Sequence, residues 1–292
     1  YSIANVTRRL LGVEFTHTLS KNTFYQFRLN RMETDYENHP GRARNPKIVK
    51  VIGQVELDET PFGWIDSPEN PLNIIGVGHN FARAQDTSKV ITWTGKLDLT
   101  SQLDRWHLLK AGVEMITYDY DMNFGDVFNL GQVFLRQIWS AHPKQFAAYA
   151  QDKIEFNAMI ANVGLRLDYF DPSGNWIVYA PFERAFSAKN RDTRNEQLAT
   201  SPTEKQLSLS PRLGISFPIS LNSKLFFNYG HFRQMMTARE LFQIEEETRG
   251  NVVSVGNPNL ALQRTVAYEL GYEQNLFNRL LLRLSGYYRD SD

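Results

Sequence analysis

The feature that most constrains this chain is an alternation of apolar and polar residues with a period of two. Between residues 266 and 273, large apolar or aromatic side chains occupy every second position (Val266, Tyr268, Leu270, Tyr272), and small or charged residues lie between them. This period is that of a β-strand with two different faces. It returns at residues 280–287, directly after Asn278-Arg279, which predicts a hairpin with one apolar and one charged face.

A short pattern of the form apolar-Gly-apolar-polar occurs five times along the chain. The copies begin at Leu11, Ala111, Val163, Leu213 and Leu270. On a strand, the Gly and the polar residue share the face opposite the apolar residues. Two interpretations follow. In a soluble two-sheet protein the polar face is solvated and Gly only weakens the strand, whereas in a membrane barrel the apolar face meets lipid and the Gly face lines a crowded or wet lumen.

Composition excludes several classes of protein. The 292 residues carry a net charge of zero and include no Cys, so disulfides and thiolate metal sites are excluded and no basic footprint for nucleic acid exists. No run of ~18 apolar residues is present, which excludes a membrane-spanning helix. A transmembrane barrel remains compatible, because its signal is alternation.

The chain divides into ten predicted strands in five hairpins. They cover about 9–19 with 23–36, 90–103 with 105–120, 146–156 with 160–170, 206–219 with 224–234, and the pair described first. Turns within pairs are short, and the connections between pairs, at about 37–89, 121–145, 171–205 and 235–263, are far longer than usual loops. Strict alternation of short and long places all tight turns on one rim of an up-and-down barrel, as in outer-membrane barrels.

Aromatic residues gather towards both ends of the predicted strands, as expected for rings at two lipid–water interfaces. Those near the long loops are Tyr36, Trp93, Tyr118, Tyr120, Tyr169, Phe170, Phe232, Tyr287 and Tyr288, and those near the turns are Trp106, Phe156, Phe217 and Phe277.

Several segments carry a family resemblance. Gly256-Asn-Pro-Asn-Leu260, followed by Tyr268-Glu-Leu-Gly-Tyr-Glu273, resembles the barrel signature of TonB-dependent outer-membrane receptors. Pro211-Arg-Leu-Gly-Ile215 and Asn228-Tyr-Gly-His-Phe232 are similar to other strands of these barrels, and such matches span nearly the whole chain in the family's order.

The resemblance implies an all-β fold, an antiparallel up-and-down transmembrane barrel of about 22 strands filled by an N-terminal plug. We expect this chain to be a partial one from the middle of the barrel, without the plug and TonB box. The implied function is TonB-energised uptake of a siderophore, cobalamin, glycan or peptide across a Gram-negative-type outer membrane. The implied partners are outer-membrane lipid and lipopolysaccharide, the plug and through it TonB, a surface lipoprotein, and a small-molecule or oligomeric substrate, with no nucleic acid.

The charged residues on the polar faces are the candidate functional residues. We expect them to line the lumen and to pair between neighbouring strands into a network against which a plug packs, with the Gly positions making room. They are Glu14, Arg28, Lys96, Asp98, Lys110, Glu114, Glu155, Arg166, Asp168, Arg212, Glu269, Glu273 and Arg283. The alternative is that they line water and pair with nothing.

Other chemistry has weaker support in the sequence. We expect no catalytic residues and no cofactor, since no hydrolase, nucleotide-binding or Cys/His motif occurs. Residues 119–126 place oxygens at alternate positions as in a calcium loop, but the Gly comes one place late and Leu130 stands where a Glu is needed, so no metal site is predicted. Weak substrate-binding candidates are the outer-loop aromatics Trp64, Trp139, Trp176 and Tyr179, which equally suit packing of the loops on one another.

Two alternative functions stay open. One is a structural or adhesive outer-membrane barrel that transports nothing, and the other is a soluble β-sandwich that binds carbohydrate. The sandwich requires the apolar side chains to be buried between two stacked sheets.

Overall fold

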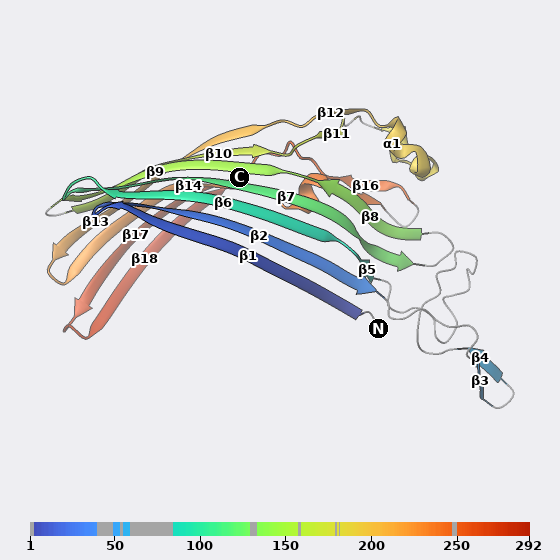
Figure 1. The fold of residues 1–292 in the computed structure, drawn as a ribbon, viewed down its shortest axis with the longest axis horizontal. Coiled ribbons are helices and arrows are strands. Elements are labelled where there is room, and N and C mark those ends of the chain that lie inside the picture. The colour runs from blue at the N-terminus through green and yellow to red at the C-terminus, as the bar shows by residue number, and fades with distance from the viewer. Residues whose placement is uncertain are drawn as a thin grey trace.

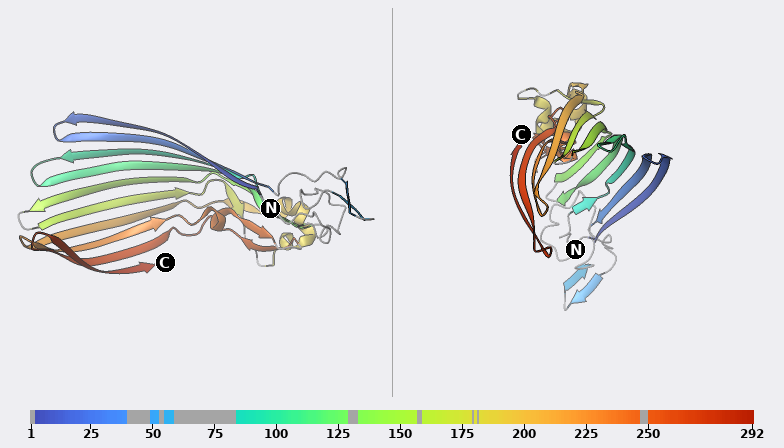
Figure 2. Two further views of the ribbon diagram at one scale, coloured as in Figure 1. Left: turned by 90° about the horizontal axis from the view of Figure 1, so that it is seen from below. Right: turned by 90° about the vertical axis from the view of Figure 1, so that its left-hand side faces the viewer.

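The computed structural model describes residues 3–39, 49–52, 55–58, 84–128, 133–156, 159–178, 180, 182–246 and 250–292. Most of them form one curved antiparallel sheet of 12 strands (Figures 1 and 2). The strands are β1 (Ile3–Ser20), β2 (Thr23–His39), β5 (Ala84–Asp86), β6 (Lys89–Gln102), β7 (His107–Phe128), β8 (Val133–Ala141), β9 (Lys144–Phe156), β10 (Met159–Asp171), β13 (Gln206–Ser220), β14 (Ser223–Gln234), β17 (Gln263–Leu276) and β18 (Leu280–Ser291).

Spatial order follows chain order throughout this sheet. Strand β5 continues the line of β6, and β8 continues that of β9, because β5 and β8 pair with the outer part of β7. If β5 is counted with β6 and β8 with β9, the sheet has ten strands side by side, in the order β1-β2-β6-β7-β9-β10-β13-β14-β17-β18. Each of these strands pairs with the strand before it and the strand after it in the chain. The predicted up-and-down topology and its five hairpins are therefore confirmed.

The sheet is open. Within the described residues, β1 and β18 each have a single hydrogen-bonded neighbour, so the two outermost strands leave one edge each unpaired. Figure 2 shows the strands following one another around an arc that does not close.

The short turns gather at one end of the sheet and the longer connections at the other (Figure 1). The turn between β6 and β7 shows how a short connection is fixed. The Asp104 carboxylate accepts hydrogen bonds from the backbone N–H groups of Trp106, at 2.7 Å, and His107, at 2.9 Å. These bonds favour the charged form of Asp104 and hold its pKa below the usual value of 3.8.

Cross-strand register aligns residues of one kind across the sheet. A row of apolar residues runs over seven strands: Phe15, Phe27, Leu97, Val113, Ala148, Leu167 and Leu209. The neighbouring row on the other side of the sheet is Glu14, Arg28, Lys96, Glu114, Ala147, Asp168 and Ser208. We call these two sides the apolar face and the polar face.

The apolar face is exposed. The side chains of Val163 and Leu165, in the middle of β10, are 48% and 47% exposed, and similar values recur along the other strands. No second sheet covers this face among the described residues, so the β-sandwich interpretation is wrong. A large uncovered apolar surface instead requires an apolar environment.

Smaller elements lie in the longer connections. They are β3 (Val49–Ile52) with β4 (Val55–Asp58), β11 (Asn175–Ile177) with β12 (Thr200–Pro202), β15 (Ile244–Glu246) with β16 (Val252–Val255), the 3-10 helices η1 (Arg184–Phe186) and η2 (Ala188–Thr193), and the helices α1 (Arg194–Gln197) and α2 (Ala238–Phe242). The described helices are all too short, or too polar, to cross a membrane.

Two of the predicted long connections contain strands. Within residues 37–89, β3 and β4 form a separate pair and β5 joins the large sheet. The predicted loop 121–145 instead continues the sheet, since β7 extends through Phe128 and pairs with β8. Backbone pairing continues here although the sequence lacks a strong alternating pattern.

A small hydrophobic core lies at the loop end of the sheet. Phe170, Leu241 and Phe242 are almost fully buried there, together with Ala141. Gly256 approaches α2 so closely that a Cβ would lie 2.7 Å from the carbonyl carbon of Leu241. The first residue of the Gly256–Leu260 motif is therefore a Gly because the backbone of α2 occupies the space of a side chain.

Candidate functional site on the polar face

Asp98 is the centre of one charged cluster on the polar face. Its carboxylate accepts a hydrogen bond from the Arg28 guanidinium at 2.5 Å and another from the Tyr149 hydroxyl at 2.5 Å, and Lys96 lies 3.6 Å away. Gly112 lies between Asp98 and Tyr149 in the register, and a Cβ there would clash with both side chains. This Gly provides the room that the contact needs.

A second cluster is built around Arg166 of β10. Its guanidinium donates to Asp168 on the same strand at 2.7 Å and to Glu114 of β7 at 3.3 Å. Strand β9 lies between β7 and β10, so Arg166 and Glu114 meet across an intervening strand. Side chains from strands two apart converge on the concave side of a curved sheet, which identifies the polar face as that side.

A third cluster lies near the tight turns. Glu273 accepts contacts from Lys224 at 2.8 Å and from Arg283 at 3.4 Å. The Arg283 guanidinium also lies over the ring of Phe226, 5.0 Å from its centroid. Phe226 occupies the space above Gly271, where a Cβ would be 2.1 Å from the ring. Strand neighbours thus pair these charges, as in the hypothesis of a polar network.

The remaining candidates behave differently. Glu155 pairs with Lys153 on its own strand. Glu14 accepts a 3.5 Å hydrogen bond from Gln26, and Glu269 accepts one of 2.9 Å from Asn228. Lys110 and Arg212 have no carboxylate partner within the described part of the chain. The structure therefore brings together Arg28, Lys96 and Asp98; Glu114, Arg166 and Asp168; and Glu273 with Arg283.

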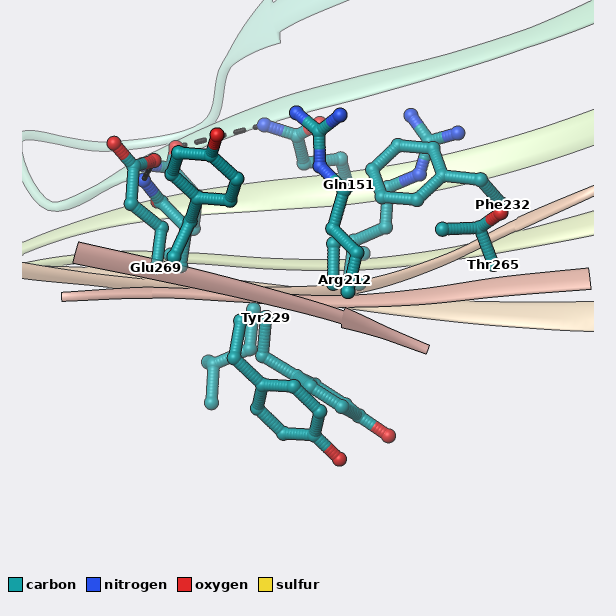
Figure 3. A pocket seen from close by; sticks show the side chains of 16 residues that line it. Gln151, Arg212, Tyr229, Phe232, Thr265 and Glu269 are labelled. Atoms are coloured by element: carbon teal, nitrogen blue, oxygen red, sulfur yellow. Dashed lines mark hydrogen bonds between the residues drawn. The ribbon is translucent and has the colours of Figure 1, made fainter. Parts of the chain in front are cut away.

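A hollow of about 790 Å³ opens over β9, β10, β13, β14, β17 and β18. Gly164, Gly214, Gly230 and Ala267 contribute to its floor, so small residues leave the space empty. Figure 3 shows Gln151, Arg212, Phe232, Thr265 and Glu269 on one side of the strands, with Tyr229 on the other. The sequence pattern contained the glycines but not their alignment across strands, which depends on register.

Two of the loop aromatics belong to the small core instead of a free binding surface. The ring centroids of Trp139 and Trp176 lie 6.1 and 6.0 Å from that of Phe242. The Trp176 indole N–H donates to the carbonyl oxygen of Gly256 at 2.8 Å. Both residues therefore pack the loops on one another. Trp64 and Tyr179 lie outside the described residues.

The aromatic residues near the long loops do not form one outward belt. Trp93, Tyr169 and Tyr288 are in register with the apolar face. Tyr287 pairs with Glu269 and Phe232 with Thr265 on the polar face, whereas Tyr120 and Phe170 join the loop core. The prediction of a belt is therefore wrong for Tyr287, Phe232, Tyr120 and Phe170. Nearness to a strand end does not fix on which face of the sheet a ring lies.

The structure offers no metal centre within the described residues, where no cluster of three or more His, Cys, Asp or Glu side chains exists. Asp119 and Asp121, the first acids of residues 119–126, lie on β7, and Asp119 contacts His142 at 3.0 Å. His107 contacts Asp152 at 2.6 Å, another pair that sequence spacing did not indicate.

Helix α2 is fixed by a capping box outside the strands. The Thr237 hydroxyl and backbone N–H both donate to the Glu240 carboxylate, at 2.8 and 2.9 Å. These bonds lower the pKa of Glu240 from its usual 4.5. The cap fixes the N-terminal end of α2, and Leu241 and Phe242, at its other end, enter the core.

Taken together, a curved up-and-down sheet, an exposed apolar face and a concave charged face define the wall of a transmembrane β-barrel. The sequence model of the family described as TonB dependent receptor-like, β-barrel, matches residues 2–292. The chain therefore belongs to this family of outer-membrane receptors and transporters. The outer membrane is therefore its location.

Solved structures show the same fold. The chain is similar to the copper transporter OprC (TM-score 0.59, 14% identity, 97% of this chain and 38% of that one). It is similar to the hemophore receptor HasR of Serratia marcescens, solved with its hemophore HasA and heme (TM-score 0.62, 13% identity, 100% and 40%). It is also similar to the alcaligin receptor FauA of Bordetella pertussis (TM-score 0.56, 11% identity, 100% and 38%).

The chain thus spans about two fifths of the length of these structural relatives. None of the curated proteins matches the sequence.

Proposed function

We propose that this chain is the middle part of a receptor barrel that imports a scarce substrate, with energy delivered by TonB through a plug that fills the barrel. The single observation that carries the proposal is the pairing of charges on the concave face within a sheet whose family is that of TonB-dependent receptors.

The paired charges suit the wall of a plugged lumen. Asp98 and Glu273 are only 13% and 15% exposed in their side chains, and each is bound by two cations. A wall of compensated ions supports a polar, protein-filled interior, since an unpaired charge facing a plug would cost several kcal/mol to desolvate. The clusters would then keep the wall rigid while the plug moves.

The outer loops suit a port of fixed shape. Trp139 and Trp176 pack with Phe242 and α2, so this part of the port is held by its own small core. The substrate class is open among siderophores, cobalamin, glycans and peptides. A small lipoprotein on the cell surface is a further partner that we propose for the larger of these substrates.

Growth on limiting nutrient tests the function. A strain that lacks the intact receptor is compared with a strain that lacks TonB on a panel of ferric siderophores, cobalamin, glycans and peptides. We expect both strains to fail on the same substrate and the receptor gene to restore growth only where TonB is present. Uptake that persists without TonB, or no substrate that depends on the receptor, would favour a structural or adhesive barrel.

A further inference from the structure

One row of the polar face contains cations and no acid. It crosses β7, β9, β10, β13, β14, β17 and β18 in order, through Lys110, Gln151, Gly164, Arg212, Gly230, Ala267 and Arg289. Side chains opposite one another in a ladder are neighbours on the same face. Three positive charges therefore lie at one level of the concave surface.

These cations differ from the other arginines of the polar face. Arg28, Arg166 and Arg283 each have a carboxylate within 3.4 Å. In contrast, the guanidinium of Arg212 lies over the Phe232 ring at 4.9 Å, and that of Arg289 over the Tyr287 ring at 5.3 Å. Within the described residues neither has an ion-pair partner, so their charges stay available to a ligand.

The floor between the two arginines is made of small residues, and the Phe232 ring and the Arg212 side chain lie over Gly230, 3.4 and 3.5 Å from the position of a Cβ. Gly230 and Ala267 separate Arg212 from Arg289 in the row, and all four line the hollow of about 790 Å³. At ~4.8 Å per strand, the two arginine Cα atoms are about 14 Å apart, and both side chains line the same hollow. The aromatic rings beneath them keep the guanidinium planes in place.

The margin of the hollow adds neutral hydrogen-bonding groups. Gln151, Asn162 and Asn228 contribute amides from three strands. Glu269, in the next row, is the acid that lines the hollow, and it already accepts the Asn228 amide at 2.9 Å. The balance of charge in the hollow is thus positive, with two guanidiniums against one carboxylate.

We propose that the Arg212–Arg289 hollow is a carboxylate-binding site. Guanidinium groups bind carboxylates through two parallel N–H···O bonds, which match the planar fork of Arg better than any neutral ligand does. The proposal rests on the proposed function, because only an intact barrel encloses this face. The carboxylate comes either from an acidic side chain of the plug or from a free acid that enters the barrel.

A titration tests the free-acid source. Glutarate is titrated into the intact receptor in detergent, with its uncharged diamide, glutaramide, as the control ligand. We expect glutarate alone to bind, and the Arg212→Gln/Arg289→Gln double variant to bind it about tenfold or more weakly. The matched control is Arg105→Gln, because Arg105 also lies over an aromatic ring, that of Trp106 at 4.6 Å, but at a tight turn. If the parent receptor binds glutarate, an equal affinity in the double variant overturns the proposal.

Photo-crosslinking tests the plug source. With a benzoylphenylalanine at Ala267 of the intact receptor, we expect a cross-linked plug peptide that contains Asp or Glu, and a several-fold lower yield in the double variant but not in Arg105→Gln. If a carboxylate of the plug already occupies the hollow, we also expect that added glutarate does not bind. Failure of both arms, with neither glutarate binding nor an acidic cross-linked peptide, overturns the carboxylate site.

The two proposals fail in different ways. A cross-linked plug peptide without an acid, at unchanged yield in the double variant, overturns the carboxylate site and leaves TonB-dependent uptake standing. Uptake that does not need TonB overturns the proposed function whatever glutarate does. Folding of each variant is checked by its migration on a gel with and without heating, so that a misfolded barrel is recognised before either readout.

Discussion

Gly256 lies so close to the backbone of α2 that no side chain fits at this position. A Cβ there would lie 2.7–2.8 Å from three backbone atoms of Leu241 and Phe242, none of which can rotate away. We expect Gly256→Ala to destabilise the packing of α2 by about 1–3 kcal/mol. Hydrogen exchange of the α2 amides in the intact receptor measures this. Gly95→Ala is the control, since nothing lies within 4 Å of its Cβ position, and equal exchange in both variants contradicts the argument.

Arg166 carries a second prediction for a single residue. The Arg166 side chain is 28% exposed and forms ion pairs with Asp168 and Glu114. Arg166→Leu therefore leaves both carboxylates without their cation. We expect a loss of about 2–4 kcal/mol in the free energy of unfolding, measured by denaturant titration in detergent. Ser208→Ala serves as the control, because the buried Ser208 hydroxyl has no hydrogen-bond partner. A loss no larger than that of Ser208→Ala would show that the charged cluster does not stabilise the wall.

Among the elements, α2 has a stability that depends on pH through its capping box. The folded-state pKa of Glu240 is lowered, so the charged cap stabilises α2 above the usual value of 4.5 and is lost as pH falls through the folded pKa. We expect hydrogen exchange at α2, corrected for intrinsic rates, to increase below pH 4.5. Thr237→Ala should remove most of this dependence, and a cap that is unchanged at low pH would contradict the prediction.

The elements also show what the sequence determines. Hairpins such as β13–β14 were predictable to within one residue at their turn, because lipid on one side and a polar lumen on the other enforce the alternation. The extension of β7 to Phe128 was not predictable, since the sequence there lacks the strong alternation that marks the other strands. The Arg212–Arg289 hollow could not be predicted from the sequence for another reason. The two arginines are far apart in sequence, and only the register of β13, β14, β17 and β18 aligns them.

At the scale of the whole molecule, the two faces of the sheet should respond oppositely to charge. Leu165 lies at the middle of β10 on the apolar face, and Asn162 lies on the polar face three residues earlier. We expect Leu165→Arg to cost about 2–4 kcal/mol in the outer membrane, whereas Asn162→Arg costs much less. The measure is the yield of folded, heat-modifiable barrel in the membrane fraction. Similar yields for both variants would contradict the assignment of the apolar face to lipid.

The pairing of each strand with its neighbour in sequence also bears on how such barrels diversify. Because every hairpin leaves and returns on the same rim, a duplicated or deleted hairpin keeps all remaining strands in their original direction and all long connections on the same rim. Loss of one strand alone would invert everything after it. An up-and-down topology therefore allows strands to be gained or lost in steps of two without reversing the rest, and one long connection to be exchanged by itself.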